Sequence, residues 1–243
     1  MLAKIVSVGV LVATAALADD VSLTPFKDNT LYESPLGDLS NGRGQHVFAG
    51  ASGTSEDRRA LLAFDVAAAI PAGSRIDGAT LRLHMSRTIS GPFAVSVHRV
   101  LADWGEGESD AAGAEGAGGE AQANDATWLH TFFDQSFWHT PGGDFDPAGR
   151  AMTIVGDIGF YSWSSPGLVS DVQAWLDSPQ TNLGWLLLGG DEGELSTSKR
   201  FDSRDHLDPL LRPMLTIQYT IPEPSVIVLV TIGLLAWGRR ERD

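Results

Sequence analysis

The sequence contains no cysteine, which excludes disulfide bonds and thiolate metal sites. Basic residues are scarce, because 17 Lys and Arg stand against 31 Asp and Glu and give a formal net charge of −14. A surface of this charge repels nucleic-acid phosphate and anionic membranes, so nucleic acid is excluded as a partner. Divalent cations, neutral sugars or cationic partners suit such a surface better.

Long apolar runs are rare and lie near the two ends of the chain. The first run covers residues 5–17, follows Lys4 and ends in Ala16-Leu17-Ala18. A basic residue, an apolar segment and small residues at an A-x-A site are typical of a secretory signal peptide. We therefore expect residues 1–18 to be a signal peptide that is cleaved after Ala18.

The second apolar run covers residues 226–237 and precedes Arg239 and Arg240. As a helix, residues 225–238 would span about 21 Å, which is shorter than the roughly 30 Å hydrocarbon core of a bilayer. Flanking residues must help this segment to cross, and the arginines would stay on the cytoplasmic side. We expect a membrane-associated hydrophobic helix here, and a single exported domain over residues 19–221.

Short alternating patterns predict that this domain is built from strands. The two strongest patterns, residues 60–66 and 79–85, flank the turn residues 71–74 and predict a hairpin that anchors the fold. Asp28-Asn29 is expected to form a turn. Further strands are predicted at residues 21–23, 30–33, 93–97, 152–155, 159–163, 185–188 and 215–219.

One helix and one long loop complete the predicted architecture. Ser165 is a suitable N-cap before Pro166, and apolar residues at helical spacing predict a short helix that ends before Pro179. Residues 105–124 are mostly Gly, Ala, Glu, Gln and Ser, a composition typical of a mobile loop. The fold class is therefore all-β: an antiparallel β-sandwich, jelly-roll-like, with one short helix and terminal hydrophobic helices.

An ordered set of short motifs resembles the DNRLRE domain proteins over most of residues 21–219. The motifs include Asp28-Asn29-Thr30-Leu31-Tyr32-Glu33, Arg59-Ala60-Leu61-Leu62, Asp103-Trp104-Gly105-Glu106-Gly107, Pro141-Gly142-Gly143-Asp144-Phe145, Asp171-Val172-Gln173-Ala174-Trp175-Leu176 and Ser203-Arg204-Asp205. This resemblance implies a β-sandwich module of exported proteins that is related to a family of carbohydrate-binding modules. It implies no particular ligand.

The C-terminal segment, residues 222–243, resembles a PEP-CTERM sorting signal. Pro222-Glu223-Pro224 precedes the apolar run, and Arg239 and Arg240 follow it. The resemblance implies processing by an exosortase in bacteria that make exopolysaccharide. The alternative is an ordinary tail anchor that is never processed.

No catalytic arrangement is visible in the sequence. The six histidines show no H-E-x-x-H or other paired spacing, and His84 and His98 fall on the outward faces of predicted strands, where solvation is the common outcome. Arg204 is expected to be a buried structural residue paired with a carboxylate such as Asp65.

Two acidic loops are candidates for a structural calcium site. Asp144 and Asp146 flank a phenylalanine in one loop, and Asp191, Glu192 and Glu194 lie in another. Loop carboxylates are the ligands that a hard cation prefers. Neither loop has the EF-hand spacing, and simple solvation is the alternative.

Tryptophans are the candidates for a sugar-binding platform, although in a sandwich they are more often core residues. We assign Trp175 to the core. Trp128 and Trp138 border a glycine-rich loop, so at least one of these two residues is expected to be exposed for ligand.

These observations predict an exported, surface- or matrix-associated module that binds polysaccharide or has a structural role. One alternative is a secreted polysaccharide hydrolase or lyase, which requires a deep cleft with converging carboxylates or histidines of perturbed pKa. A second alternative is a purely structural or adhesive matrix protein without a glycan ligand.

Overall fold

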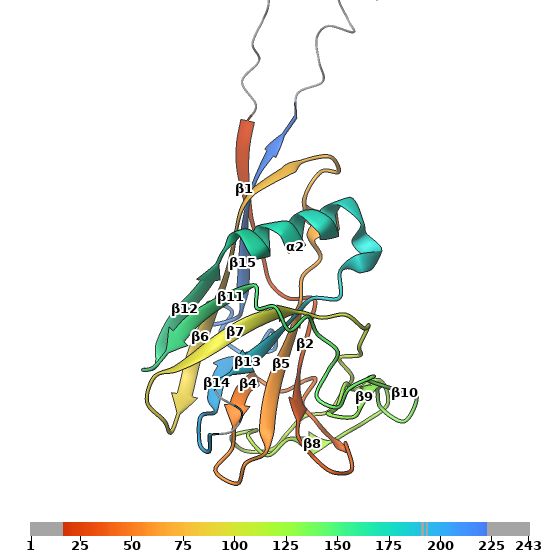
Figure 1. Cartoon of the computed structure of the whole chain (residues 1–243), viewed down its shortest axis with the longest axis vertical. Coiled ribbons are helices and arrows are strands. Elements are labelled where there is room, and N and C mark those ends of the chain that lie inside the picture. Colours follow the sequence, from red (N-terminus) through yellow and green to blue (C-terminus); the bar gives the residue numbers. More distant parts are fainter. Residues whose placement is uncertain (1–16, 191, 193, 223–243) are drawn as a thin grey trace, which may run out of the picture.

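The computed structural model describes residues 17–190, 192 and 194–222, and this part of the chain is an all-β antiparallel sandwich (Figure 1). The expected fold class is confirmed. The strands are β1 Leu17–Leu23, β2 Lys27–Tyr32, β3 Leu39–Ser40, β4 His46–Ala51, β5 Asp57–Ala63, β6 Arg75–Thr88, β7 Phe93–Arg99, β8 Gly119–Glu120, β9 His130–Phe132, β10 Ser136–Phe137, β11 Ala151–Val155, β12 Gly159–Ser164, β13 Trp185–Gly189, β14 Lys199–Asp202 and β15 Met214–Ile221. The helices are α1 Val66–Ala69, α2 Pro166–Asp177 and the 3-10 turn η1 Pro179–Thr181.

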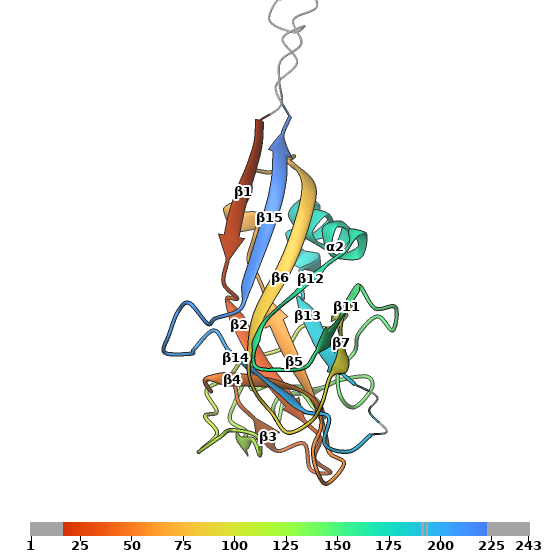
Figure 2. The ribbon, with the colours of Figure 1, turned by 90° about the vertical axis from the view of Figure 1, so that its left-hand side faces the viewer.

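A single curled sheet forms both layers of the sandwich. Its strands follow the order β1-β15-β6-β14-β4-β5-β13-β7-β11, with β12 beside β6 and β2 beside β5. The sheet changes layers at β4, which pairs with β14 on one side and with β5 on the other. Figure 2 shows β1, β15 and β6 side by side in one layer, and α2 packs beside β6.

The main core fills the space between the two layers. Alternate residues of β6, from Ala79 to Met85, face this core, and Leu62 and Phe64 meet them from the opposite layer. Trp163, Trp175 and Trp185 are fully buried here, together with the apolar face of α2. Trp175 is thus a core residue, as predicted.

A second core lies on the outer face of β5 and β13. It is covered by residues 100–149, the long segment that carries β8, β9 and β10. Its members are Leu31, Leu61, Ala63, Val100, Trp104, Ala126, Trp128, Trp138 and Leu186. Because β5 is buried on both faces, both alternating sets of its residues are apolar, as the sequence pattern indicated.

The predicted hairpin between residues 60–66 and 79–85 is wrong. β5 pairs with β2, β4 and β13, whereas β6 pairs with β12, β14 and β15, so the two strands lie in opposite layers. Asp65 caps α1 by accepting a hydrogen bond from Ala68 N at 3.2 Å, and the chain crosses between layers through this helix and the turn before β6. The alternating patterns identified the strands but not their partners.

Two further local predictions are also wrong. Asp28 and Asn29 lie inside β2 and are fully buried, rather than forming a turn. Residues 105–124 are packed into the fold, because β8 pairs with β3 and the side chains of Ser109 and Glu115 are buried. Polar contacts, rather than apolar area, hold this segment against the sheet.

The helix prediction is confirmed in detail. The hydroxyl of Ser165 accepts a hydrogen bond from Leu168 N at 3.1 Å, Pro166 occupies the first turn, and the helix ends at Asp177. The first backbone N–H groups of a helix have no carbonyl partner within the helix, and the Ser165 hydroxyl supplies an acceptor for one of them. The helix therefore begins where the sequence predicts.

Most of the predicted signal segments lie outside the described residues. This holds for residues 1–16 of the expected signal peptide, for Glu223, Pro224, Arg239 and Arg240, and for both terminal hydrophobic helices. Ala18, the expected cleavage residue, lies in β1 opposite Thr220, and Pro222 directly follows β15.

No helix within residues 17–222, the gaps at 191 and 193 set aside, is long and apolar enough to cross a membrane.

Candidate functional site

The candidate site is built on the outer face of β4, β14 and β6. Val47, Phe201 and Met85 point into the core from these three neighbouring strands and are fully buried. Because side chains alternate along a strand, the residues between them point outward. In the register, Asp202 faces His46 and Arg200 faces Phe48. A β-bulge between Arg200 and Phe201 shifts the pairing with β6, so that Arg87 lies opposite Arg200.

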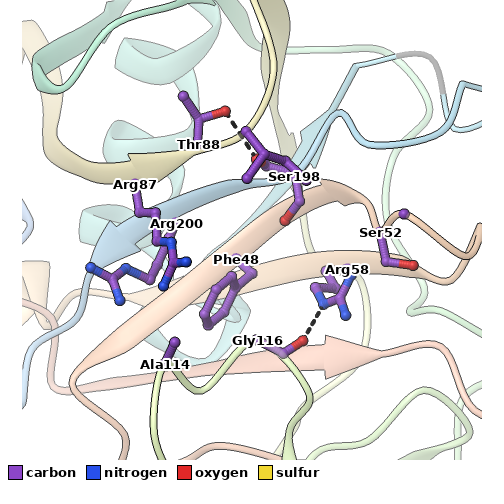
Figure 3. Close-up of a pocket in the computed structure, with 11 residues that line it drawn as sticks. Phe48, Ser52, Arg58, Arg87, Thr88, Ala114, Gly116, Ser198 and Arg200 are labelled. Carbon is purple, nitrogen blue, oxygen red and sulfur yellow. Dashed lines mark hydrogen bonds between the residues drawn. The ribbon is translucent and has the colours of Figure 1, made fainter.

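Three arginines line a pocket of about 260 Å³ beside Phe48 on this face (Figure 3). We call it the arginine pocket; its residues are Phe48, Ser52, Gly53, Arg58, Arg87, Thr88, Ile89, Ala114, Gly116, Ser198 and Arg200. Arg87 and Arg200 reach toward the same space beside the ring of Phe48, and Arg58 lies on the other side of that ring. No lining residue is acidic.

The arginine pocket is lined by positive side chains, whereas the whole protein has a net charge of −14. Arg58 donates from Nε to Gly116 O at 2.8 Å, and Arg200 donates from Nε to Ser86 Oγ at 3.1 Å. Burial lowers the pKa of both guanidinium groups, and Arg87 lowers the pKa of Arg200 further, against the opposing effect of Asp202. Among the described residues, no carboxylate forms an ion pair with any of these three arginines. The pocket therefore offers guanidinium groups without a direct ion-pair partner among the described residues, on an acidic protein.

Three histidines converge on Asp202, which lies two residues after Arg200 on β14. His84 Nδ1 lies 2.6 Å from Asp202 Oδ2, while His46 Nε2 and His206 Nε2 lie 3.5 and 3.7 Å from Oδ1. The Asp202 side chain is 1% exposed, and its Oδ1 has no hydrogen-bond partner in the described structure. The imidazoles of His46 and His206 meet edge to face, with 5.8 Å between ring centroids. We call His46, Asp202 and His206 the histidine-aspartate cluster.

Sequence reasoning missed both parts of this face. His46 lies in β4, His84 in β6, and Asp202 and His206 in and after β14. These three parts of the chain are far apart in the sequence, so no spacing motif connects them. The only local signals were Asp202 and His206, four residues apart, and the alternation of β6 that placed His84 outward. His84 is partly buried against Asp202, and His98 is 6% exposed and bonded to Asp146 O at 2.9 Å, so the predicted solvation of these two histidines is wrong.

Trp128 and Trp138 are core residues, so the expectation of an exposed indole at these positions is wrong. Their exposures are 8% and 5%, and both belong to the second core. The guanidinium of Arg59 lies 4.7 Å from the Trp128 ring centroid, and Trp138 Nε1 donates to Thr127 O at 2.8 Å. The glycine-rich loop folds over the indoles instead of leaving them at the surface.

The predicted calcium ligands are placed in separate contacts. Asp144 accepts from His139 N and Thr140 N at 2.8 and 2.9 Å, and Asp146 pairs with Arg150 at 2.9 Å. Glu192 forms a bidentate pair with Arg59, with both contacts at 2.7 Å. Glu194 lies in an exposed loop, and Asp191 is outside the described residues. Protein donors thus occupy Asp144, Asp146 and Glu192.

Asp28, Glu106 and Asp205 form a second acidic cluster, with ligand atoms within 4.8 Å of one another. Burial raises the pKa of Asp28 well above its ordinary value and also raises the pKa of Glu106. Arg204 Nη1 lies 2.8 Å from both Glu106 oxygens and so supplies a cation to this cluster. Arg204 is paired with a carboxylate, as expected, but the partner is Glu106 rather than Asp65 and the Arg204 side chain is 26% exposed rather than buried.

Asp57 provides a test of the electrostatics near Arg59 and Glu192. Burial, followed by the charges of Glu192 and Glu33, raises the pKa of Asp57 from 3.8 to about 6. A carboxyl whose pKa is raised by folding contributes stability below its unfolded pKa, and this contribution is lost as the pH rises through about 6.

We therefore expect Asp57→Asn to match the wild type near pH 4 and to exceed its free energy of unfolding by about 1 kcal/mol at pH 7.5, after discounting for partial exposure. Urea unfolding of both proteins at the two pH values measures the difference. Equal gains at both pH values would show that the carboxyl charge is not the cause.

No model of a known protein family matches the chain, and no curated protein matches it.

Proposed function

We propose that the chain is an exported β-sandwich module that binds polysaccharide, and that the arginine pocket is its binding site. The observation that carries the proposal is the convergence of Arg58, Arg87 and Arg200 without an acidic partner among the described residues. Groups of this kind bind carboxylates, so the expected ligand is an acidic polysaccharide that contains uronic acid residues.

The chemistry of the pocket fits one part of a long glycan chain. The guanidinium groups match a sugar carboxylate, and Ser52, Thr88 and Ser198 supply hydroxyl or backbone partners for sugar hydroxyls. The ring of Phe48 and the side chain of Ile89 supply an apolar surface. A volume of about 260 Å³ is below the roughly 300–1,000 Å³ of pockets that enclose whole small molecules, which favours side-on contact with one or two sugar residues.

The two terminal segments complete the proposal. Residues 1–18 direct export with cleavage after Ala18, and residues 222–243 hold the protein at the inner membrane until an exosortase processes the Pro222-Glu223-Pro224 motif. The mature module then resides at the cell surface or in the extracellular matrix. The supporting observations are the sequence patterns and the resemblance to PEP-CTERM signals.

The hydrolase or lyase alternative finds less support. Asp28, whose pKa is raised well above its ordinary value by burial, is fully buried and accepts a hydrogen bond from Arg204 N at 2.7 Å, so substrate has no access to it. The arginine pocket contains no carboxyl to act as an acid or base.

Binding of oligouronates and of neutral oligosaccharides to the purified protein tests this proposal. On a glycan array and by calorimetry, we expect uronate ligands to bind and neutral ligands of equal length to bind at least tenfold more weakly. Arg200→Ala should weaken uronate binding about tenfold, because one charged hydrogen bond contributes about 1.5–3 kcal/mol. Arg200→Lys should also weaken it, because it keeps the charge but loses the planar fork.

Arg75→Ala is the matched control, because Arg75 is exposed and pairs with Asp77 at 2.8 Å away from the pocket. Equal losses for Arg75→Ala and Arg200→Ala would contradict the assignment of the site. If no glycan on the array binds, with or without calcium, the structural or adhesive alternative is favoured.

A further inference from the structure

We propose that the histidine-aspartate cluster is a binding site for one divalent transition-metal ion of the Zn²⁺ class. One ligand atom from each of His46, Asp202 and His206 lies within 4.8 Å of the other two. We assign His46 Nε2, His206 Nε2 and Asp202 Oδ1 as the ligands, because both Nε2 atoms lie close to Oδ1. This site is distinct from the arginine pocket, so the inference does not depend on the proposed polysaccharide binding.

The spacing of Asp202 Oδ1 from each of the two Nε2 atoms is close to that of a tetrahedral metal site. Bonds of about 2.0–2.1 Å from zinc to nitrogen and oxygen place neighbouring ligand atoms about 3.3 Å apart. The two separations from Asp202 Oδ1, 3.5 Å to His46 and 3.7 Å to His206, exceed this value by only a few tenths of an ångström. Rotation of the imidazoles is therefore enough to close the site, and the fourth position remains for water or another ligand.

Asp202 provides an independent observation. Its Oδ2 is held by His84 Nδ1 at 2.6 Å, which fixes the orientation of the carboxylate. Its Oδ1 is buried, lacks a hydrogen-bond partner in the described structure, and faces the two Nε2 atoms. A buried, unpaired carboxylate oxygen costs free energy, and a bound cation removes that cost.

Other contacts place the two imidazoles beside Asp202. His46 Nδ1 lies 3.2 Å from Glu115 Oε1, and Glu115 accepts hydrogen bonds from Asn41 Nδ2 at 3.0 Å and His46 N at 2.9 Å. Asp208 N donates to His206 Nδ1 at 3.2 Å, and the same ring nitrogen lies 3.3 Å from Asp208 O, so these contacts position the ring without fixing its tautomer. Metal binding at Nε2 requires the proton on Nδ1, a tautomer that Glu115 favours in His46 and that a bond to Asp208 O allows in His206.

The ligand set selects the class of metal. Two imidazoles and one carboxylate suit zinc and its neighbours in the first transition series, whereas calcium and magnesium prefer oxygen ligands alone. The charges of Asp202 and Glu115 balance a divalent ion. By contrast, the oxygen-only cluster of Asp28, Glu106 and Asp205 already contains the guanidinium of Arg204.

Titration of the full chain with Zn²⁺ after removal of metals by a chelator tests this inference. We expect one equivalent to bind with a dissociation constant of about 1 µM or lower, and Ca²⁺ or Mg²⁺ at millimolar concentration not to compete. Co²⁺ in the same site should give the visible absorption of a tetrahedral complex. Zinc should also raise Tm, because it binds only the folded state.

His206→Ala, in the connection between β14 and β15, should weaken Zn²⁺ binding at least 100-fold and remove the Co²⁺ absorption. His139→Ala is the control, because His139 is an exposed histidine outside the cluster, and it should bind as the wild type does. Asp202→Asn, which keeps the shape of the side chain, serves as a second variant if His206→Ala does not fold. Absence of stoichiometric binding by the wild type, or unchanged binding by His206→Ala or Asp202→Asn, overturns the proposal.

Discussion

Replacement of Asp171 by alanine is expected to lower the free energy of unfolding by about 3 kcal/mol. Asp171 lies on α2, is 2% exposed, and accepts hydrogen bonds at Oδ2 from Trp185 Nε1 at 3.0 Å and Arg150 Nε at 3.1 Å. Its Oδ1 lies 3.6 Å from Arg99 Nη1. Removal of one partner from a buried pair costs about 3–5 kcal/mol, and the partial exposure of the arginines favours the lower end of this range.

Urea unfolding of the wild type, Asp171→Ala and Asp171→Asn measures this effect. Asp171→Asn keeps an acceptor for Trp185 and should lose less stability than Asp171→Ala. Asp177→Ala on the same helix is the control, because Asp177 is exposed and its side chain has one hydrogen bond within the described residues, from Gln173 at 3.0 Å. Its loss should stay within about 0.5 kcal/mol. A loss below about 1 kcal/mol for Asp171→Ala would mean that the sandwich does not depend on this link between α2 and the sheet.

Local patterns predicted the elements of the fold well. The alternation of residues 79–85 predicted a strand, and the cap at Ser165 predicted a helix; both are present as β6 and α2. These signals are reliable because they depend on neighbours along the chain. Strand pairing was not predictable in this way. β5 and β6 share a short connection, yet each buries its apolar face against the other across the core instead of pairing edge to edge.

The candidate site was hidden from the sequence for a related reason. Arg87 and Arg200 meet because the pairing of β14 with β6 skips Ser86 in β6 and shifts the register by one residue, and His46, Asp202 and His206 meet only through strand pairing and a loop. The net charge of −14 predicted neutral or cationic partners, whereas the arginine pocket is a local exception to that average. Composition describes the whole surface, but ligand recognition depends on a few side chains.

Segment 105–124 shows how a polar sequence is ordered without a large apolar surface. Arg43 N donates to Ser109 O at 2.8 Å, and Ala111 N donates to Asn41 Oδ1 at 2.8 Å. Gly107 has φ +72°, and a Cβ at this position would lie 1.6 Å from Asp125 Oδ1, so only glycine fits. The glycine-rich composition that predicted mobility is required here for close packing.

Asn29 joins segment 105–124 to the sheet. Its replacement by alanine is expected to lower the free energy of unfolding by about 4 kcal/mol. The side chain is fully buried in β2 and donates from Nδ2 to Glu106 O at 2.8 Å. Its Oδ1 accepts from Ser40 Oγ and Asn41 N, both at 3.0 Å. Each buried group left without a partner costs about 1–3 kcal/mol, and partial relaxation or water entry reduces the sum.

Chemical unfolding and amide hydrogen exchange of Asn29→Ala test this role together. Besides the lower free energy of unfolding, we expect amides of residues 105–126 to exchange faster than those of β6. Residues 105–126 lose their attachment to the sheet, while the main core stays intact. Gln218→Ala is the control, because Gln218 carries the same amide group on the exposed face of β15 and should change stability by less than about 0.5 kcal/mol. Uniform acceleration of exchange in both cores would argue against a local attachment. Asn29 would then stabilise the whole sandwich, and residues 105–126 would be held by other contacts, such as those of Glu115 with Asn41 and His46.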